Sequence, residues 1–286
     1  MSNGGRRRTS GKKHSQSSAK WLQRQAKDPY TERARKEGRP SRAYYKLEEI
    51  DERIRRQEKS NSKNGQRRKR NDGSGLFGKG DVVIDLGAAP GGWSVYASKK
   101  IGSTGILVAV DLLPLDQKAV HSLETDESMA DSYFAQADFN AFTTKDFISE
   151  AITDGRDNAE VCQADIIMSD MAANFTGNKS TDALRTLALC ENALQFAAGA
   201  SCFDPPASKS PKHDEAIESS PKSWQDVGLL RLGGSFLCKY FQCGKENERM
   251  LLDTAENRFE DVRILKPKAS RKESAERYLL ARHFKG

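Results

Sequence analysis

The amino-acid sequence predicts an α/β protein with a mostly parallel, seven-stranded sheet and helices on both faces. Short apolar runs alternate with segments of helical spacing from residue 81 onward. This alternation is typical of an open sheet whose parallel strands are joined by crossover helices. A glycine-rich segment follows the first run directly, which indicates a nucleotide-like ligand at the carboxyl end of the sheet. We therefore expect a Rossmann-like architecture.

Each apolar run has the length and composition of a buried strand. The expected strands are 81–87, 105–111, 132–138, 164–170, 234–241, 261–267 and 277–284. Only nine residues join the last two strands, which leaves no room for a crossover helix. One of them should therefore run antiparallel to its neighbour. Helices are expected at 91–101, near 143–152, at 181–200 and at 245–259.

The positive charge of the chain lies mostly outside this α/β region. The chain holds 47 Lys and Arg against 40 Asp and Glu, a net charge of +7. Residues 1–27 carry eight basic residues and no acid, and residues 55–70 carry eight with one acid. The remainder is acidic, with 31 basic against 39 acidic residues. Such basic, Ser/Asn/Gly-rich segments favour solvated arms, and an anionic polymer is the partner they suit.

Composition also divides the chain and excludes some classes of protein. We expect a disordered basic tail or transit peptide (1–19), a helical extension (20–54), a basic insertion (55–80) and the main domain (81–286). The last contains a loop insertion, 204–223, rich in Pro, Ser and Lys, for which we expect no chemical role.

Neither a disulfide framework nor a metal site is expected. The five cysteines form no C-x-x-C pair and the four histidines are scattered, which favours a reducing compartment. No apolar run has the roughly 20 residues that a membrane span needs. The start of the chain lacks the apolar stretch of a secretory signal. It contains Arg and Ser but no acidic residue, a composition compatible with a mitochondrial transit peptide.

The segment VVIDLGAAPGGW (82–93) carries the ligand-binding signal. A buried strand holding Asp85 leads into glycines that open a helix, where the backbone can approach a ligand closely. A dinucleotide-binding loop would read G-x-G-x-x-G, but Ala89 occupies the second glycine position and Pro90 follows. This departure disfavours a dehydrogenase.

Acidic residues also follow the next two strands. Asp111 lies 24 residues after Gly87, where an acid would bind a ribose diol. Asp138 and Phe139 follow the third strand and suit an adenine amino group and ring face. Singly, each Asp could be a turn or cap residue. Together they describe a nucleoside pocket without a phosphate clamp, which suits S-adenosylmethionine better than NAD.

Lys239 is unusual for its position. It lies within the apolar run GSFLCKYF (234–241), and an interior strand of such a sheet is covered on both faces. A buried ammonium must be paired, neutralised or directed into a cleft. We therefore expect it to face a functional site.

At this point the sequence resembles the RrmJ/FtsJ-type ribose 2′-O-methyltransferases of ribosomal RNA. The matching segments are SRAYYKLEEID (41–51), DLGAAPGGWS (85–94), VDLLPLD (110–116), QADF (136–139), SDMAAN (169–174), KYFQ (239–242) and KPKASRKESAERYLLA (266–281). They keep the family's order and span most of the chain. The segment KWLQRQAKDPYTERARKEG (20–38) looks more like the mitochondrial large-subunit rRNA enzymes than the bacterial ones.

The resemblance implies a Rossmann-like, S-adenosylmethionine-dependent methyltransferase fold and a set of site residues. The family's Lys-Asp-Lys-Glu tetrad falls on Lys46, Asp170, Lys239 and Glu276. With the glycine loop, the expected cofactor-binding residues are Gly87, Pro90, Gly91, Gly92, Trp93, Asp111, Asp138, Phe139 and Asp170. No metal is implied.

The chemistry explains why these residue types suit the reaction. Methyl transfer needs a nucleophilic oxygen in line with the S–CH₃ bond, and positioning supplies much of the rate. A lysine with a lowered pKa can accept the proton of a ribose 2′-hydroxyl, and a charged lysine can hold the developing alkoxide. Without the resemblance, Lys46 would pass for a solvated helix lysine and Glu276 for a surface acid. Tyr44 and Tyr45 could stack on bases or pack in the core.

The resemblance therefore predicts an enzyme that methylates the ribose 2′-oxygen of a uridine in large-subunit rRNA. Its partner would be that rRNA or a pre-ribosomal particle, and we expect a monomer in the mitochondrion, with the cytoplasm or nucleus as alternatives. An enzyme acting on tRNA or an mRNA cap is the alternative within the class. A non-catalytic rRNA-binding assembly factor is the alternative outside it.

Overall fold

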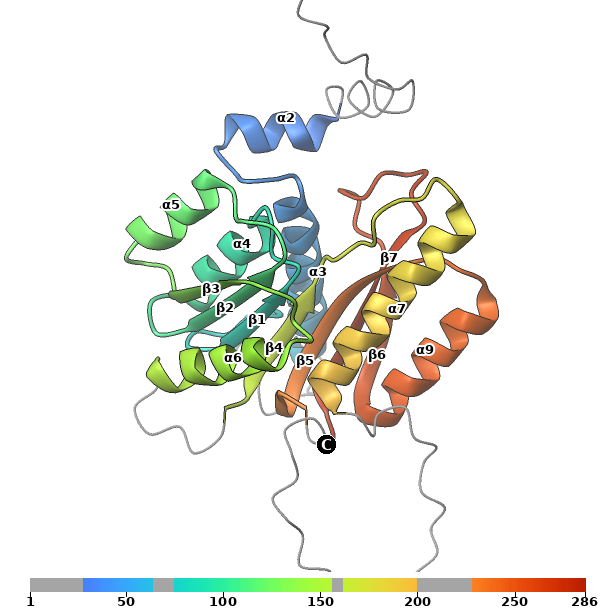
Figure 1. The fold of residues 1–286 in the computed structure, drawn as a ribbon. Coiled ribbons are helices and arrows are strands. Elements are labelled where there is room, and N and C mark those ends of the chain that lie inside the picture. The colour runs from blue at the N-terminus through green and yellow to red at the C-terminus, as the bar shows by residue number, and fades with distance from the viewer. Residues whose placement is uncertain (1–27, 64–74, 156–161, 200–227) are drawn as a thin grey trace, which may run out of the picture.

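The computed structural model describes residues 28–63, 75–155, 162–199 and 228–286. Its centre is a seven-stranded sheet with the strand order β3-β2-β1-β4-β5-β7-β6 (Figure 1). The strands are β1 (Val82–Leu86), β2 (Ile106–Asp111), β3 (Asp131–Gln136), β4 (Ala164–Ser169), β5 (Leu230–Phe241), β6 (Phe259–Leu265) and β7 (Glu276–Phe284). All seven predicted strands are therefore confirmed.

The sheet is parallel except for one strand. β7 pairs antiparallel with both β5 and β6, while the remaining pairs are parallel. The short connection after β6 produces the predicted antiparallel hairpin. β5 begins earlier than predicted, at Leu230, because Leu230 pairs with Ala164 ahead of a bulge in the ladder.

The described part of the chain contains seven helices. They are α2 (Pro29–Lys36), α3 (Ala43–Lys63), α4 (Gly92–Ile101), α5 (Gln117–Thr125), α6 (Phe142–Asp154), α7 (Lys179–Ala198) and α9 (Lys245–Arg258). The four predicted helices after residue 81 correspond to α4, α6, α7 and α9. The sequence analysis missed α5, because Ala119 is its one fully buried residue and its apolar stripe is correspondingly weak.

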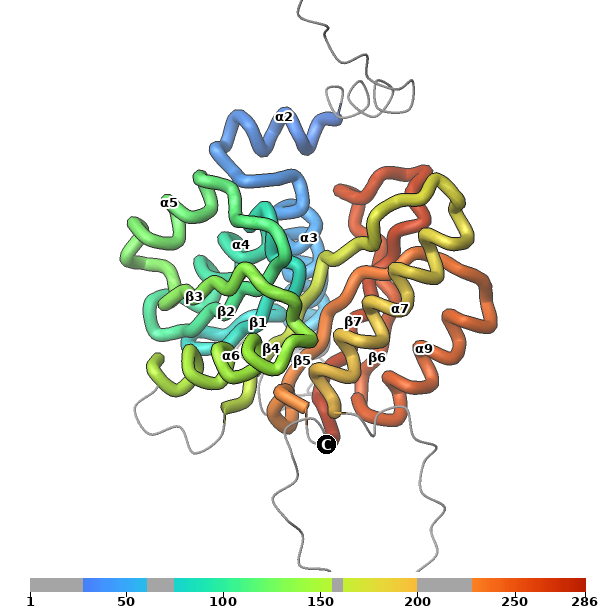
Figure 2. The backbone as a smooth tube through the Cα atoms, viewed as in Figure 1, coloured from blue at the N-terminus to red at the C-terminus, as the bar shows by residue number. Residues whose placement is uncertain are grey.

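Successive residues of each strand point to opposite faces, so the core divides into two layers. One layer packs β1 side chains such as Val82 and Ile84 against α6, α7 and α9. The other packs Val83, Met168 and Leu237 against α3 and α4. Figure 2 shows α6, α7 and α9 in front of the sheet and α3 and α4 behind it.

The N-terminal extension is part of this second layer. The rings of Tyr44 and Tyr45 are buried, at 4% and 0% exposure, which decides for core packing over base stacking. Gly92 lets α3 approach α4, since a Cβ there would lie 2.4 Å from Ser41 Oγ and 3.1 Å from the Tyr44 nitrogen. The sequence of α4 therefore fixes where α3 lies.

α3 crosses the expected boundary between this extension and the basic insertion. α3 continues past residue 54 to Lys63 instead of giving way to a solvated arm. Two of its charged side chains past residue 54 have partners: Arg55 contacts Asp51 at 2.7 Å, and Glu58 accepts a hydrogen bond from Arg282 at 2.5 Å. Charge composition alone cannot reveal such partners. Residues 64–74, the tail 1–19 and the loop insertion 204–223 lie outside the described residues.

Two other predictions concern the whole chain. Among the described residues, no helix is long and apolar enough to cross a membrane. The described cysteines, Cys162, Cys190, Cys238 and Cys243, carry free thiols. Cys202 lies outside the described residues.

Candidate active site

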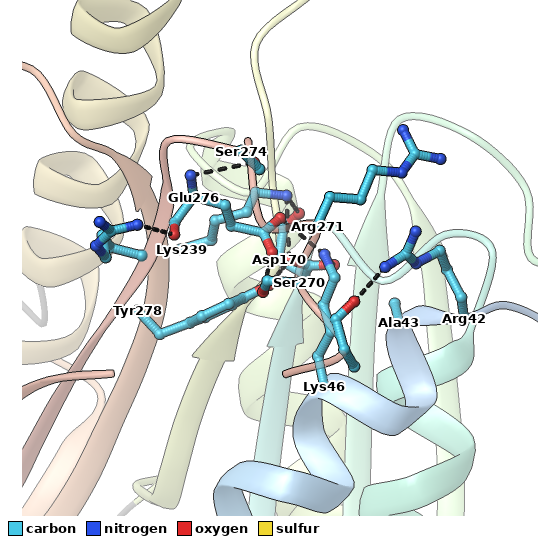
Figure 3. A network of polar contacts seen from close by, with 12 residues as sticks. Arg42, Ala43, Lys46, Asp170, Lys239, Ser270, Arg271, Ser274, Glu276 and Tyr278 are labelled. Carbon is cyan, nitrogen blue, oxygen red and sulfur yellow. Dashed lines mark hydrogen bonds and ion pairs between the residues drawn. The ribbon is translucent and has the colours of Figure 1, made fainter. Parts of the chain in front are cut away.

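Four elements meet at the carboxyl ends of the parallel strands. Asp170 follows β4 directly, Lys239 lies near the end of β5, and Glu276 opens β7. Lys239 points to the same face of the sheet as Leu237, and Glu276 points to the same face as Tyr278. Leu237 and Tyr278 both belong to the core layer that packs against α3. Lys46, in the first turns of α3, approaches from that layer. The structure thus brings the four predicted catalytic residues together (Figure 3).

Asp170 is the centre of the group. Its Oδ1 lies 3.1 Å from Lys239 Nζ, and its Oδ2 lies 3.7 Å from Lys46 Nζ. Lys239 also donates a hydrogen bond to the main-chain oxygen of Asp170. Lys46 in turn donates to Glu276 Oε2 at 2.8 Å. The four side chains therefore form one continuous row, Lys239, Asp170, Lys46 and Glu276.

Tyr278 joins this row and was missed by the sequence analysis. Its hydroxyl donates to Asp170 Oδ1 at 2.9 Å, and its ring lies 5.8 Å from Lys46 Nζ. In the ladder between β5 and β7, Tyr278 pairs directly with Lys239. Glu276 and Tyr278 are two residues apart in one strand, so they share a face. This alternation is the signal that could have identified Tyr278.

The loop between β6 and β7 holds Glu276 in place. Ser270 donates to Glu276 Oε1 at 2.6 Å, and Ser274 accepts from the Glu276 main-chain nitrogen at 3.2 Å. Arg42 anchors this loop by donating to the Ala269 carbonyl oxygen. Glu49 of α3 accepts from the Ala269 nitrogen at 3.1 Å. The loop is thereby fixed to α3.

These contacts set the charges of the buried groups. Burial alone would lower the pKa of Lys46, but Asp170 and Glu276 outweigh it and raise that pKa above its ordinary value. Burial favours neutral Asp170, yet Lys239 and Lys46 lower its pKa overall. Burial and the adjacent carboxylates raise the pKa of Tyr278. Lys46 is therefore a cation and Asp170 an anion, and the expectation of a lowered lysine pKa does not hold for Lys46.

The glycine loop, residues 87–92, adjoins this row at the end of β1. Gly87 and Gly91 have φ values of +75° and +101°, a region that favours glycine. A Cβ at Gly87 would lie 2.1 Å from Met171 Cγ, and one at Gly91 would lie 2.4 Å from Ala119 Cβ. Pro90 accepts a hydrogen bond from the Asp116 nitrogen at 3.2 Å. The backbone conformation and the neighbouring side chains therefore require glycine at both positions.

Asp111 holds the shape of this loop. Its Oδ2 accepts from the Ala89 nitrogen at 2.8 Å, and its Oδ1 accepts from the Leu113 nitrogen at 2.8 Å. The carboxylate therefore joins the end of β2 to the glycine loop at the place predicted for a ribose diol. Contact with a ribose stays a prediction.

Trp93 and Phe139 have roles in the core. The Trp93 indole donates to the Ala43 carbonyl oxygen at 3.0 Å, and its ring lies 5.7 Å from that of Tyr278. Phe139 packs edge to face on Phe196 at 5.8 Å and is 6% exposed. Asp138 beside it is exposed. Contact of Asp138 or Phe139 with a ligand stays a prediction.

Asp85 is a further functional candidate, although the sequence does not single it out as a cofactor-binding residue. It is fully buried, Ser94 Oγ donates to its Oδ2 at 2.6 Å, and its Oδ1 has no hydrogen-bond partner. Burial chiefly, with Asp170 and Asp111 adding to it, raises the pKa of Asp85 to about 7. S-adenosylmethionine carries a sulfonium and an ammonium group. The carboxylates of Asp85, Asp111 and Asp170, which influence one another electrostatically, would stabilise such a cation. These three residues therefore fit the predicted cofactor.

The raised pKa of Asp85 predicts a pH-dependent stability. Because the folded pKa exceeds the unfolded value of about 3.9, the fold is favoured while Asp85 is protonated and loses that advantage as pH rises through about 7. We expect ligand-free Asp85→Asn to gain stability relative to wild type between about pH 4 and 8. Urea denaturation of both proteins across this range measures the difference.

Asp253→Asn is the control, since Asp253 lies on the exposed surface of α9 with its side chain 58% accessible. A difference between wild type and Asp85→Asn that stays constant with pH would contradict the titration of Asp85.

Comparison with known proteins agrees with this geometry. Residues 39–284 match the FtsJ-like methyltransferase family. The Ribosomal RNA large subunit methyltransferase E of Azorhizobium caulinodans is 38% identical over 280 residues, covering 97% of this chain and 88% of the relative. The protein of the same name from Rickettsia rickettsii is 36% identical over 270 residues, covering 94% and 90%.

A solved structure shares the fold. A Plasmodium falciparum protein described as a ribosomal RNA methyltransferase superposes with a TM-score of 0.54 at 20% identity, covering 86% of this chain and 98% of its own. The family match includes the glycine loop and all four residues of the buried row, and it makes S-adenosyl-L-methionine the cofactor. The chain therefore belongs to the FtsJ-like methyltransferase family.

Proposed function

We propose that this protein transfers a methyl group from S-adenosyl-L-methionine to the ribose 2′-hydroxyl of a uridine in large-subunit rRNA, and so contributes to ribosome assembly. The observation that carries the proposal is the buried row Lys239, Asp170, Lys46 and Glu276 at the carboxyl ends of the strands. The rRNA substrate is supported by the names of the bacterial relatives. The mitochondrial location is part of the proposal and rests on the N-terminal sequence.

Each residue of the row has a role in this chemistry. When bound, the cofactor supplies an electrophilic methyl group on sulfur. Lys239 would orient the 2′-hydroxyl and, as a neutral amine after its own proton has passed to solvent, would accept the hydroxyl proton while the oxygen takes the methyl group and the S–CH₃ bond breaks. Asp170 holds Lys239 in place, and Lys46 with Glu276 fixes Asp170 from the other side. Because the row is assembled before RNA arrives, the hydroxyl meets a preorganised site.

The proposal is tested by mapping 2′-O-methyl groups in rRNA from cells with and without the gene. We expect one uridine of the mitochondrial large-subunit rRNA to lose its methyl group when the gene is absent. Cytosolic rRNA, tRNA and mRNA caps from the same cells serve as internal controls. Loss of methylation only in one of those RNAs would contradict both the substrate and the location proposed here.

Lys239 provides the sharpest test of the mechanism. We expect Lys239→Ala to abolish methyl transfer while cofactor affinity stays within a few-fold of the wild-type value, because Lys239 acts on the RNA oxygen. Lys239→Arg should fail almost as badly, since a guanidinium does not give up its proton readily and is bulkier. Single-turnover methylation with substrate RNA measures the rate, and calorimetry measures cofactor binding.

Lys99→Ala is the matched control, because Lys99 is an exposed lysine near the far end of α4. If Lys239→Arg kept most of the wild-type rate, Lys239 would be a positive contact and no proton acceptor. If Lys239→Ala kept it, the catalytic role would be refuted and a non-catalytic assembly factor favoured.

The basic cluster Arg67, Arg68, Lys69 and Arg70 is proposed to contact RNA phosphates. Replacing all four by serine should reduce the slope of log affinity against log salt by up to about 3, since single-stranded RNA contributes about 0.7 per neutralised phosphate. The substitution avoids α3, in which Arg55 pairs with Asp51 and Glu58 accepts a hydrogen bond from Arg282. Filter binding at several salt concentrations measures the slope, with cofactor affinity expected to be unchanged.

Arg249→Ser on α9 is the control, an arginine whose side chain is 82% exposed. An unchanged slope for the fourfold variant would show that this cluster makes no phosphate contact.

A further inference from the structure

An aromatic pair lies beside the catalytic lysine. The rings of Phe175 and Phe241 stack with centroids 5.8 Å apart and planes inclined by 26°. Phe241 is two residues after Lys239 in β5, so both side chains point to the same face of the sheet. In the ladder, Phe241 pairs with Glu276. The pair therefore lies at the outer end of the buried row.

This pair is not explained by the core. Phe175 is 69% exposed, and Phe241 is partly exposed. Neither residue belongs to the two buried clusters on the faces of the sheet. Single exposed apolar residues are common on protein surfaces. An exposed ring stacked on a second ring, two residues along the strand from a catalytic lysine, is a more specific arrangement, because it offers a flat apolar surface near that lysine.

The connection that carries Phe175 is anchored. Asp182, in the first turn of α7, accepts hydrogen bonds from the nitrogen and the hydroxyl of Thr176, each at 2.7 Å. It also accepts from the Gly177 nitrogen at 3.3 Å. The residue next to Phe175 is thus fixed to a helix. This connection and the β6–β7 loop lie at the same end of the molecule (Figure 1).

We infer that Phe175, supported by Phe241, is a stacking platform for the base of the nucleotide whose ribose lies at Lys239. Unpaired RNA bases stack on aromatic side chains, and such contacts tolerate different bases because every base has a flat face. A base held on Phe175 would fix its own ribose beside the adjacent catalytic row. This role deepens the proposed function and rests on it.

The test compares Phe175→Ala, Phe175→Leu and Phe175→Tyr with wild type. The substrate is a large-subunit rRNA fragment containing the uridine found by mapping, and a second RNA keeps that ribose but lacks its base. On the complete RNA, we expect kcat/KM to fall about 10-fold for Ala and for Leu and to be retained for Tyr, since only an aromatic face stacks. On the abasic RNA, all four proteins should be equally slow.

Controls separate the possible outcomes. Cofactor affinity and melting temperature should be unchanged in all three variants, and Met250→Ala, at an exposed apolar position on α9, should match wild type on both RNAs. Full activity of Phe175→Ala or of Phe175→Leu would overturn the stacking role. A deficit of Phe175→Ala that persists on the abasic RNA would overturn the assignment to that base. Absence of methyl transfer by wild type would refute the proposed function, and the platform with it.

Discussion

The partial burial of one carboxylate, Asp170, whose side chain is 16% exposed, is the constraint on which the rest of the site depends. A buried anion is tolerated only when cations and donors compensate for its lost hydration. Here the compensation comes from Lys239 on β5, Lys46 on α3 and Tyr278 on β7. Removing one partner of a buried ion pair typically costs about 3–5 kcal/mol. The charge of Asp170 therefore ties three other elements to the end of β4.

This constraint explains why an N-terminal helix belongs to the catalytic domain. Lys46 and Glu276 are 230 positions apart in sequence, yet they form a 2.8 Å ion pair. Contacts away from the site position α3 and thereby set the distance between Lys46 and Glu276. Gly92 admits α3 against α4, and the Trp93 indole holds the Ala43 carbonyl oxygen at the first residue of α3. The loop GGW, predicted as a cofactor element, thus also places a catalytic lysine.

The sequence predicted best what depends on local pattern. Seven strands followed from apolar runs, and Lys239 stood out because charge is rare inside such a run. Features that depend on distant partners were missed. Tyr278 owes its role to the register between β5 and β7, and the continuation of α3 past residue 54 depends on partners such as Arg282. Lys46 and Glu276 look ordinary in sequence, so only the family resemblance singled them out.

The charges of the site also bear on how RNA reaches it. The row contains two lysines and two carboxylates, so its formal charge is zero, and the nearby Asp85 and Asp111 add no positive charge. A site of this kind orients a hydroxyl but does not attract a phosphate backbone, which needs excess positive charge. Under the proposed function, affinity for RNA must come from elsewhere: from basic segments for the backbone and from aromatic faces for a base. The catalytic row can then stay buried and balanced, because it is not required to bind the polymer.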